Sequence, residues 1–527
     1  MLFRVSTLQK HTKHGAVLVV AGIVLLCLVS LQMWILDNEV EQQRNPIDVF
    51  VASVHAANFN NLLRPYAVFL NTMLPDTPRY EWRRRQQLSF RCVSDKNEVA
   101  DAEYRDSDGG TDCSWKNYYF VCEFTKPALS VRLVDQEGFG PRVLVKQPVT
   151  GKIPLVACLS RTFYYENWQV MLTVLEMYKA MGVSEFSIHI LNIVKEVYDI
   201  LKLYEDEINL KIHPGFLIPK IRGRFENPNF QTETMNQIMC YNDCLYNYRE
   251  AADFLIFTDM DDLIIPENGD LLSKARQFLQ RFPLAASMEF AWTTSNFNGV
   301  PHPNQFSIPR LLSGVTNHVE AYGKSIVIPK RMLRAIIHNT EFYTARIRGY
   351  TNVNANQTAG HGLTLHMREM VMMSFNESLE NDRSIDQVNL DVVNLDAMKR
   401  ADKAFRKRMN GKFKDTFNAL PHSLFFTPQL RQCYIDITAT RHKGANLCAS
   451  INNCKIDYEN SPGCATVSAE DEAYINGKRS ALHPYISLSL CFFGEPAASS
   501  GQTSGRLRLL FRSGFVRRDT ANLDYMS

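Results

Sequence analysis

The chain has 527 residues, of which 45% are hydrophobic and 21% charged, and its formal net charge is +3. This composition excludes a disordered or collagen-like chain, and the length predicts two to four domains. Three cations near the start, Arg4, Lys10 and Lys13, account for the excess charge. Without them basic and acidic residues are equal in number, so the overall charge gives no reason to expect a nucleic-acid binder.

An uncharged, largely apolar run covers residues 15–36, and acidic residues follow it. As a helix, this run reaches about 33 Å, enough to cross a bilayer. The charges on either side predict a type II signal-anchor, with a cytosolic tail over 1–14, a transmembrane helix over 15–36 and a stem over 37–46. The alternative is a cleaved signal peptide, but its apolar core is shorter, about 7–15 residues.

The 12 cysteines fit an oxidising compartment, because all but Cys27 follow the predicted anchor. Clusters at residues 92–122 and 433–464 are spaced as in disulfide frameworks, and no C-x-x-C zinc knuckle occurs. An odd number follows the anchor, so at least one thiol is expected to be free or to pair between chains, which leaves a homo-oligomer open. Asn356 and Asn376 begin glycosylation sequons, which agrees with a secretory-pathway lumen.

Short β-like runs over residues 47–151 predict a small β-rich domain held by disulfides. The pattern then changes to alternating strands and helices. Strands are expected at 153–159, 186–190, 210–212 and 254–258, and helices at 167–181, 194–206 and 234–249. Such alternation predicts an α/β domain with a parallel sheet, over 152–430, that binds ligands at the carboxyl ends of its strands.

The remaining residues, 431–527, are expected to form a cysteine-containing C-terminal extension with a poorly ordered tail. Just before it, a basic helix near 399–408 is expected to be a solvated surface, with an anionic-lipid or acidic-acceptor patch as the alternative.

Three carboxylates, Asp259, Asp261 and Asp262, directly follow the apolar strand over 254–258. In extended geometry residues i and i+2 point the same way, so Asp259 and Asp261 are expected to bind one cation, with Asp262 behind them orienting an amide or a lysine. Oxygen ligands of this kind suit Mn²⁺ or Mg²⁺, which would neutralise the phosphates of a departing nucleoside diphosphate. In a lumenal type II protein, this arrangement resembles a Golgi glycosyltransferase of the GT-A type.

An ordered set of motifs resembles glycosyltransferase family 92 over roughly residues 47–430. The set consists of residues 158–161, 166–169, 176–178, 182–183, 237–244, 259–262, 324–329, 338 and 365–368. Asp262 stands where the family often has Glu, and Met367 where it usually has Tyr. The resemblance implies inverting transfer of galactose from UDP-galactose, with Mn²⁺, to glycans on glycoproteins or glycolipids.

The resemblance also suggests roles for individual residues. It suggests that His366 is the further metal ligand, with His338 as the alternative, and that Arg368 binds the diphosphate. Nucleotide contacts are expected from Arg161, Glu166, Gln237 and Asn242, although a surface or structural role is open for Arg161, Gln237 and Asn242.

An inverting transferase also needs a general base, for which Glu289 is the candidate and Glu320 the alternative. Trp292 would offer an aromatic face to a sugar ring, or else be a core aromatic.

The sequence leaves two alternatives open. One is a transferase that uses another UDP-sugar, such as UDP-glucose or UDP-N-acetylglucosamine, because the metal site does not read the sugar. The other is a non-catalytic, glycan-binding type II membrane protein. A two-metal phosphoesterase is not favoured, because the additional His and Asp clusters that it needs are not evident in the sequence.

Overall fold

The computed structural model describes residues 49–57, 64–75, 90–106, 113–134, 138, 140, 142–218, 227–232, 236–313, 316–337, 340–342, 349–372, 394–443, 447–467, 471–474, 480–481 and 486–490. The predicted anchor over 15–36 and the tail beyond 496 lie outside these residues. Within them, no helix is both long and apolar enough to cross a membrane. The described residues belong to one compact unit, Met1–Cys491.

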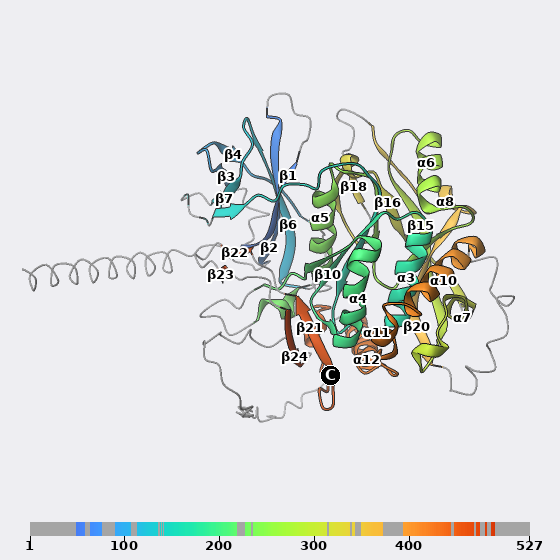
Figure 1. Cartoon of the computed structure of the whole chain (residues 1–527). Helices are drawn as coiled ribbons and strands as arrows, with labels where there is room; N and C mark the ends of the chain where they lie inside the picture. Colours follow the sequence, from blue (N-terminus) through green and yellow to red (C-terminus); the bar gives the residue numbers. More distant parts are fainter. Residues whose placement is uncertain are drawn as a thin grey trace, which may run out of the picture. The chain divides into compact units, whose positions relative to one another are not determined.

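A nine-stranded mixed sheet forms the centre of this unit (Figure 1). Its first strands are β12 (Leu210–Pro214), β10 (Glu185–Ile190), β9 (Ile153–Thr162) and β13 (Ala252–Thr258), which pair in parallel in that order. The order continues with β16 (Thr316–Val327), β15 (Ala285–Gly299), β20 (Gly362–Met372) and β14 (Asp262–Pro266), and β19 (Thr351–Val353) pairs with β15. The predicted parallel strands are thus confirmed, and a half with both antiparallel and parallel pairs extends the sheet.

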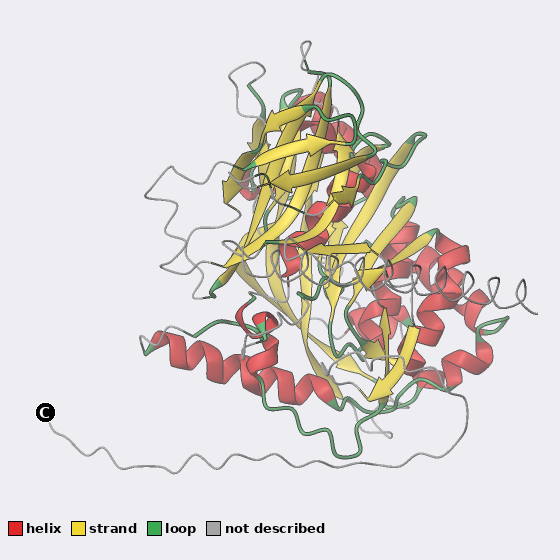
Figure 2. Ribbon diagram, turned by 90° about the vertical axis from the view of Figure 1, so that its left-hand side faces the viewer, coloured by secondary structure: helices red, strands yellow, loops and turns green. Residues whose placement is uncertain are grey.

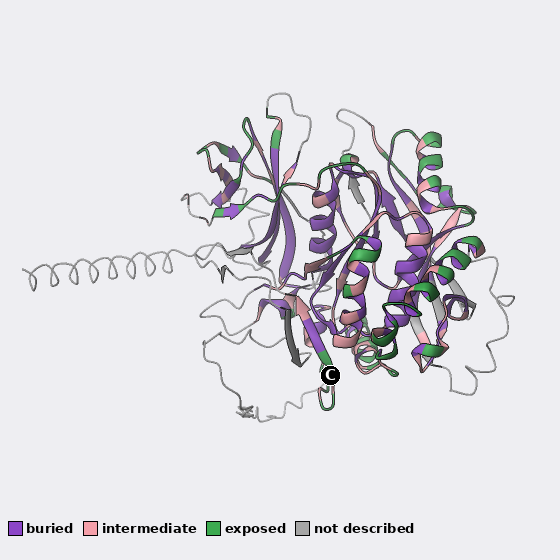
Figure 3. Cartoon of the chain, viewed as in Figure 1, coloured by how far each residue is buried: buried purple, intermediate pink, exposed green. Residues whose placement is uncertain are grey.

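The helices between the parallel strands agree with their sequence signals. α3 (Trp168–Ala180) starts at Asn167, whose side chain accepts a hydrogen bond from the Val170 amide, and it ends before Gly182, which has φ +96°. α4 (Lys195–Ile208) ends at Asn209 in the left-handed conformation. α3 is buried almost throughout, whereas α6 (Leu271–Arg281) and the basic helix α10 (Leu395–Met409) have exposed faces (Figure 3).

A six-stranded sheet contains most of the predicted β-rich region. It comprises β1 (Phe50–Ala57), β2 (Tyr66–Pro75), β6 (Trp115–Phe124) and β5 (Glu103–Asp106), extended by β22 (Asp471–Tyr474) and β23 (Ser480–Ala481). A four-stranded sheet adds β4 (Val99–Asp101), β3 (Arg91–Ser94), β7 (Ser130–Val134) and β8 (Arg142–Leu144). Figure 2 shows the strands of the molecule running beside one another, with helices around them.

The C-terminal extension contributes strands to two sheets. Strand β22 pairs with β1, and β21 (Gly463–Val467) pairs with β11 (Ile193–Val194) and β24 (Ile486–Leu490). Strands β17 (Met332–Ala335) and β18 (Thr340–Phe342) form a short hairpin. The described part also contains helices α7 (Ile308–Ser313), α8 (Ala355–Thr358), α11 (Lys414–Asn418) and α12 (Phe426–His442). The predicted domain boundaries at 151 and 430 remain predictions.

Helix α5 (Gln237–Tyr248) packs against β9 of the central sheet and against β1 and β2 of the six-stranded sheet (Figure 1). A buried carboxylate on this helix, that of Asp243, accepts hydrogen bonds from His55 Nε2 on β1 at 2.8 Å and from His189 Nε2 on β10 at 3.1 Å. A disulfide between Cys158 on β9 and Cys244 also fixes the helix. Its position relative to both sheets is therefore set by covalent and polar contacts as well as by packing.

Three further disulfides are present, Cys92–Cys122, Cys113–Cys448 and Cys433–Cys454, and Cys464 is also disulfide-bonded. The second of these joins the two cysteine clusters, a pairing that spacing alone left open. Among the described cysteines, Cys240 is the one with a free thiol, and it is buried. The odd number of cysteines after the predicted anchor therefore does not require a disulfide between chains.

Candidate active site

The acidic residues lie in a turn between two strands of the central sheet. β13 ends at Thr258 and β14 begins at Asp262, and the Asp262 amide donates to the Asp259 carbonyl at 3.2 Å across the turn. The Thr258 hydroxyl donates to the Asp262 carbonyl at 2.9 Å and fixes the turn further. The extended geometry assumed for Asp259 and Asp261 is therefore not found, because the chain reverses where alternation was expected to continue.

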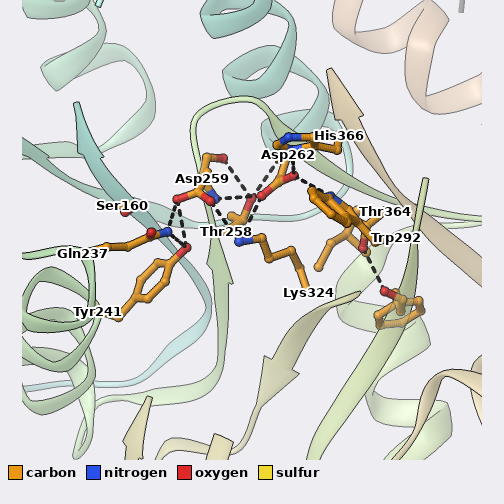
Figure 4. A network of polar contacts seen from close by, with 12 residues as sticks. Ser160, Gln237, Tyr241, Thr258, Asp259, Asp262, Trp292, Lys324, Thr364 and His366 are labelled. Atoms are coloured by element: carbon orange, nitrogen blue, oxygen red, sulfur yellow. Dashed lines mark hydrogen bonds and ion pairs between the residues drawn. The ribbon is translucent and has the colours of Figure 1, made fainter. Parts of the chain in front are cut away.

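The carboxylate of Asp259 is surrounded by donors (Figure 4). Its Oδ1 accepts from Gln237 Nε2 at 2.5 Å and from the Tyr241 hydroxyl at 3.2 Å, both on α5 and one turn apart. Its Oδ2 accepts from Lys324 Nζ at 2.9 Å, and Arg161 lies 3.6 Å from Oδ1. Burial alone would raise the pKa of Asp259, but Lys324 and Arg161 lower it below its ordinary value, so the carboxylate is ionised.

Asp262 is fully buried, and each of its oxygens has two donors. Oδ1 accepts from His366 Nδ1 at 2.6 Å and from the Trp292 indole at 3.1 Å, while Oδ2 lies 3.2 Å from both Lys324 Nζ and the Asp259 amide. Burial raises the pKa of Asp262, but Lys324 and His366 outweigh it and lower the pKa far below its usual range. The contacts with Lys324 and the Asp259 amide are of the kind expected for Asp262, and its role behind the ligands stays a prediction.

Asp261 differs from its neighbours, because its carboxylate accepts no hydrogen bond from any described residue. Burial, together with the charges of Asp262 and Asp259, raises the pKa of Asp261 to about 6. Ligand atoms of Asp261, Asp262 and His366 all lie within 4.8 Å of one another, and Asp259 is not part of this cluster. His366 opposes this shift in pKa and is the nearest cationic group of the cluster, but it donates no hydrogen bond to Asp261.

The imidazole of His366 is held by Asp262 through Nδ1, and its Nε2 has no hydrogen-bond partner in the described part of the chain. Burial tends to lower the pKa of His366, but Asp261 and Asp262 raise it to about 9. A histidine held by a carboxylate through one nitrogen commonly presents the other nitrogen to a metal. The free Asp261 carboxylate and the His366 Nε2 atom therefore fit a divalent cation, with Asp262 supporting the histidine.

The segment after β9 lies next to this cluster. Burial and the charge of Asp261 raise the pKa of Tyr165 well above its ordinary value, and the Tyr165 hydroxyl donates to the Asn167 carbonyl at 3.1 Å. Arg161, predicted to contact nucleotide, faces Asp259. Glu166 has a different environment, because its carboxylate accepts from the amides of Phe425 at 2.7 Å and Thr427 at 2.6 Å and so holds the start of α12.

The other predicted contacts are distributed more widely. Gln237 contacts the acidic turn through the Asp259 carboxylate. The side chain of Asn242 instead binds the backbone of Ala335: its Oδ1 accepts from the Ala335 amide at 2.9 Å and its Nδ2 donates to the Ala335 carbonyl at 3.0 Å, which connects α5 to β17. The Trp292 ring lies 4.3 Å from the His366 ring and donates to Asp262, so it supports the cluster directly.

Glu289, the candidate base, lies 3.3 Å from the Gly323 amide and 3.4 Å from the Asn352 side chain. Neither of these contacts reaches the carboxylates of the turn. Glu320 pairs with Trp292 through its backbone, and Arg368 lies on β20, but both side chains lie outside the described residues, as does His338. Asn356 is exposed on α8, and Asn376 is outside the described part.

Three residues of the site were not singled out from the sequence, namely Tyr165, Tyr241 and Lys324. Lys324 belongs to the 324–329 motif, and a lysine next to the apolar run 326–328 is a signal that could have suggested a buried counter-ion. Burial lowers the pKa of Lys324, but Asp259 and Asp262 raise it well above its ordinary value, so the ammonium remains charged.

Comparisons with known proteins agree with the family that the motifs suggested. The family model described as glycosyltransferase family 92 matches residues 153–401, which include the acidic turn, Lys324 and His366. One Caenorhabditis elegans protein named as a member of that family is 25% identical over 71% of this chain and 74% of its own length. A second from the same organism is 27% identical over 53% of this chain and 56% of its own length.

Among solved structures, TarS of S. aureus in complex with UDP aligns at 12% identity over 50% of this chain and 74% of that chain, with a TM-score of 0.19. A TM-score of this size supports no conclusion about this chain. The sequence relationships are more direct, since the family model spans the residues of the site. The comparisons therefore assign residues 153–401 of this chain to glycosyltransferase family 92, a family of glycosyltransferases.

Proposed function

We propose that this protein is a divalent-cation-dependent glycosyltransferase that transfers galactose from UDP-galactose, with inversion, to a glycan on a glycoprotein or glycolipid. The observation that carries the metal requirement is the pair of unpartnered ligand atoms, the Asp261 carboxylate and His366 Nε2. The donor sugar and the stereochemistry rest on the resemblance to family 92. Mn²⁺ is the proposed ion, with Mg²⁺ as the alternative.

A divalent ion bound by Asp261 and His366 would neutralise the negative charge that develops on a departing nucleoside diphosphate. The chain's own residues prepare that position. Asp262 holds the His366 ring through Nδ1, and Trp292 packs against the ring and shares the same carboxylate oxygen. Arg161 adds a cation at the carboxyl end of β9, where α/β sheets bind their ligands, and Arg368 remains the proposed diphosphate contact.

Deprotonation of the acceptor hydroxyl requires a base, and Glu289 stays the proposed one. The described contacts of Glu289 are an amide and a side-chain amide, neither of which neutralises its charge, so it is able to accept a proton. We also propose a type II orientation in the Golgi membrane, anchored by residues 15–36, with Asn356 and Asn376 glycosylated. The support for this orientation is the charge pattern around the apolar run and the disulfides of the folded part.

The test is a UDP-release assay on the purified full-length chain with UDP-galactose, UDP-glucose and UDP-N-acetylglucosamine, with a mixture of glycoprotein and glycolipid acceptors. We expect release from UDP-galactose with Mn²⁺ and none with EDTA. The Asp261→Asn variant, verified as folded by circular dichroism, should be inactive with every donor. Preference for another donor would refute the galactosyl assignment, and no turnover by folded wild-type protein under any condition would refute the enzyme.

A further inference from the structure

Lys324 lies deep in the site and touches two of the three carboxylates. Its Nζ is 2.9 Å from Asp259 Oδ2 and 3.2 Å from Asp262 Oδ2, and 2% of its side chain is exposed (Figure 4). It cannot extend to a substrate without leaving both partners. Any influence that it has on the reaction must therefore act through the carboxylates.

The local backbone is built to bring Lys324 to this position. Strands β15 and β16 change register next to it, between Phe290 and Trp292. At the preceding residue, Gly323, a Cβ atom would lie 1.7 Å from the Phe290 carbonyl oxygen, so only glycine permits the approach of the two strands. The lysine is thus placed by a close contact that no other residue at 323 would allow.

Cations of the chain already lie beside Asp259 and Asp262. Lys324 Nζ contacts both carboxylates, and Arg161 lies 3.6 Å from Asp259 Oδ1. Lys324 occupies the space between Asp259 and Asp262, where two carboxylate oxygens face the same point. Paired carboxylates of this kind bind the second ion in two-metal enzymes, where the ions lie about 3.5–4 Å apart.

We propose that Lys324 is a positioning residue that takes the place of a second cation and so keeps the site mononuclear, directing the single divalent ion to Asp261 and His366. This inference rests on the proposed metal requirement. It explains why Asp259 and Asp262, although acidic and adjacent, already have their oxygens committed to donors within the chain. Asp259 has 21% of its side chain exposed, which gives a second ion a route to the pair once the ammonium is removed.

The experiment measures Mn²⁺ bound per chain by equilibrium dialysis, and coupling between ions by electron paramagnetic resonance, on full-length protein. The wild type is expected to bind one ion. Lys324→Ala removes the charge and leaves room, so it should bind two ions and show a coupled Mn–Mn spectrum. Lys324→Met removes the charge but fills the space, and it should bind one. Lys330→Ala, which truncates a lysine whose side chain is 61% exposed, is the surface control and should match the wild type.

A folded Lys324→Ala variant that binds one ion with wild-type affinity would overturn the inference while leaving the proposed function intact. A wild type that binds no Mn²⁺ would instead contradict the metal requirement itself. If Lys324→Ala does not fold, the double variant Asp259→Asn, Lys324→Met tests the role of Lys324 instead, because it removes one negative and one positive charge together. We expect it to bind one ion within about tenfold of the wild-type affinity, as a change of that size is typical of residues behind the ligands. A loss beyond 100-fold would show that Lys324 supports the ion in another way.

Discussion

Replacing Asp261 by Asn is expected to stabilise the metal-free protein while it abolishes cation binding. The Asp261 carboxylate accepts no hydrogen bond from the described residues, and its pKa is raised from 3.8 to about 6. A shift of one pKa unit corresponds to about 1.4 kcal/mol, so the ionised carboxylate costs the folded, metal-free protein about 3 kcal/mol of unfolding free energy. Asparagine carries no such cost, because it is neutral at every relevant pH.

The stability gained in the Asp261→Asn variant should depend on pH in a definite direction. Because the folded-state pKa lies above the unfolded-state value, the cost is complete above about pH 6 and disappears as the pH falls toward 4. The gain in the Asp261→Asn variant should therefore be largest near pH 7 and small near pH 4. Urea unfolding of both proteins in EDTA at the two pH values measures it directly.

The neighbouring residue supplies a matched control with the opposite expectation. Asp262 has four donors on its two oxygens, so Asp262→Asn should lower the free energy of unfolding by about 3–5 kcal/mol, as for a broken buried ion pair. Both variants should lose Mn²⁺ binding in a titration. If Asp261→Asn is destabilised in EDTA, or if the two variants change stability alike, then Asp261 has a structural partner and the reasoning is refuted.

Three further predictions concern separate parts of the site. His366 has a pKa of about 9, so a metal ion that binds it must displace a proton. Mn²⁺ affinity should therefore fall about tenfold for each unit by which the pH is lowered from 9 to 6, and calorimetry should detect the release of one proton. An affinity that does not change with pH would contradict the ligand assignment. Glu166→Ala leaves the amides of Phe425 and Thr427 without acceptors, so it should cost about 2–4 kcal/mol of stability and expose the start of α12 to proteases; unchanged stability with much weaker UDP binding would instead support a nucleotide contact. Burial raises the pKa of the Cys240 thiol, so it should resist maleimide in the folded protein and react on unfolding in urea, and rapid labelling without denaturant would contradict its placement.

Much of the central sheet could be predicted from local pattern. The strands over 153–159, 186–190, 210–212 and 254–258 are found within β9, β10, β12 and β13, and the stop at Gly182 is found after α3. These elements are short-range, since apolar runs and caps decide them. α5 starts three residues after the predicted position, because the left-handed Asn236 that precedes the helix is not signalled by periodicity.

The site was predicted less completely than the sheet. The motif marked the acidic turn and the resemblance added His366, but neither could divide the carboxylates by role, and neither brought Trp292 to the turn. That division depends on donors from three distant elements, namely Gln237 on α5, Lys324 on β16 and His366 on β20. Strand alternation suggested that Asp259 and Asp261 act together, whereas the turn and these donors set Asp259 apart from the cluster.

By itself, the sequence determined that a parallel α/β unit ends in three carboxylates, because burial pattern and residue type are local properties of the chain. It also determined that a charge-flanked apolar run precedes a cysteine-rich body. Only the tertiary structure decided which carboxylate lacks a partner, which cysteines pair, and that a buried lysine faces two of the acids. Charge balance inside a protein is set by groups that approach within a few ångströms in space, and their separation along the chain carries no record of that approach.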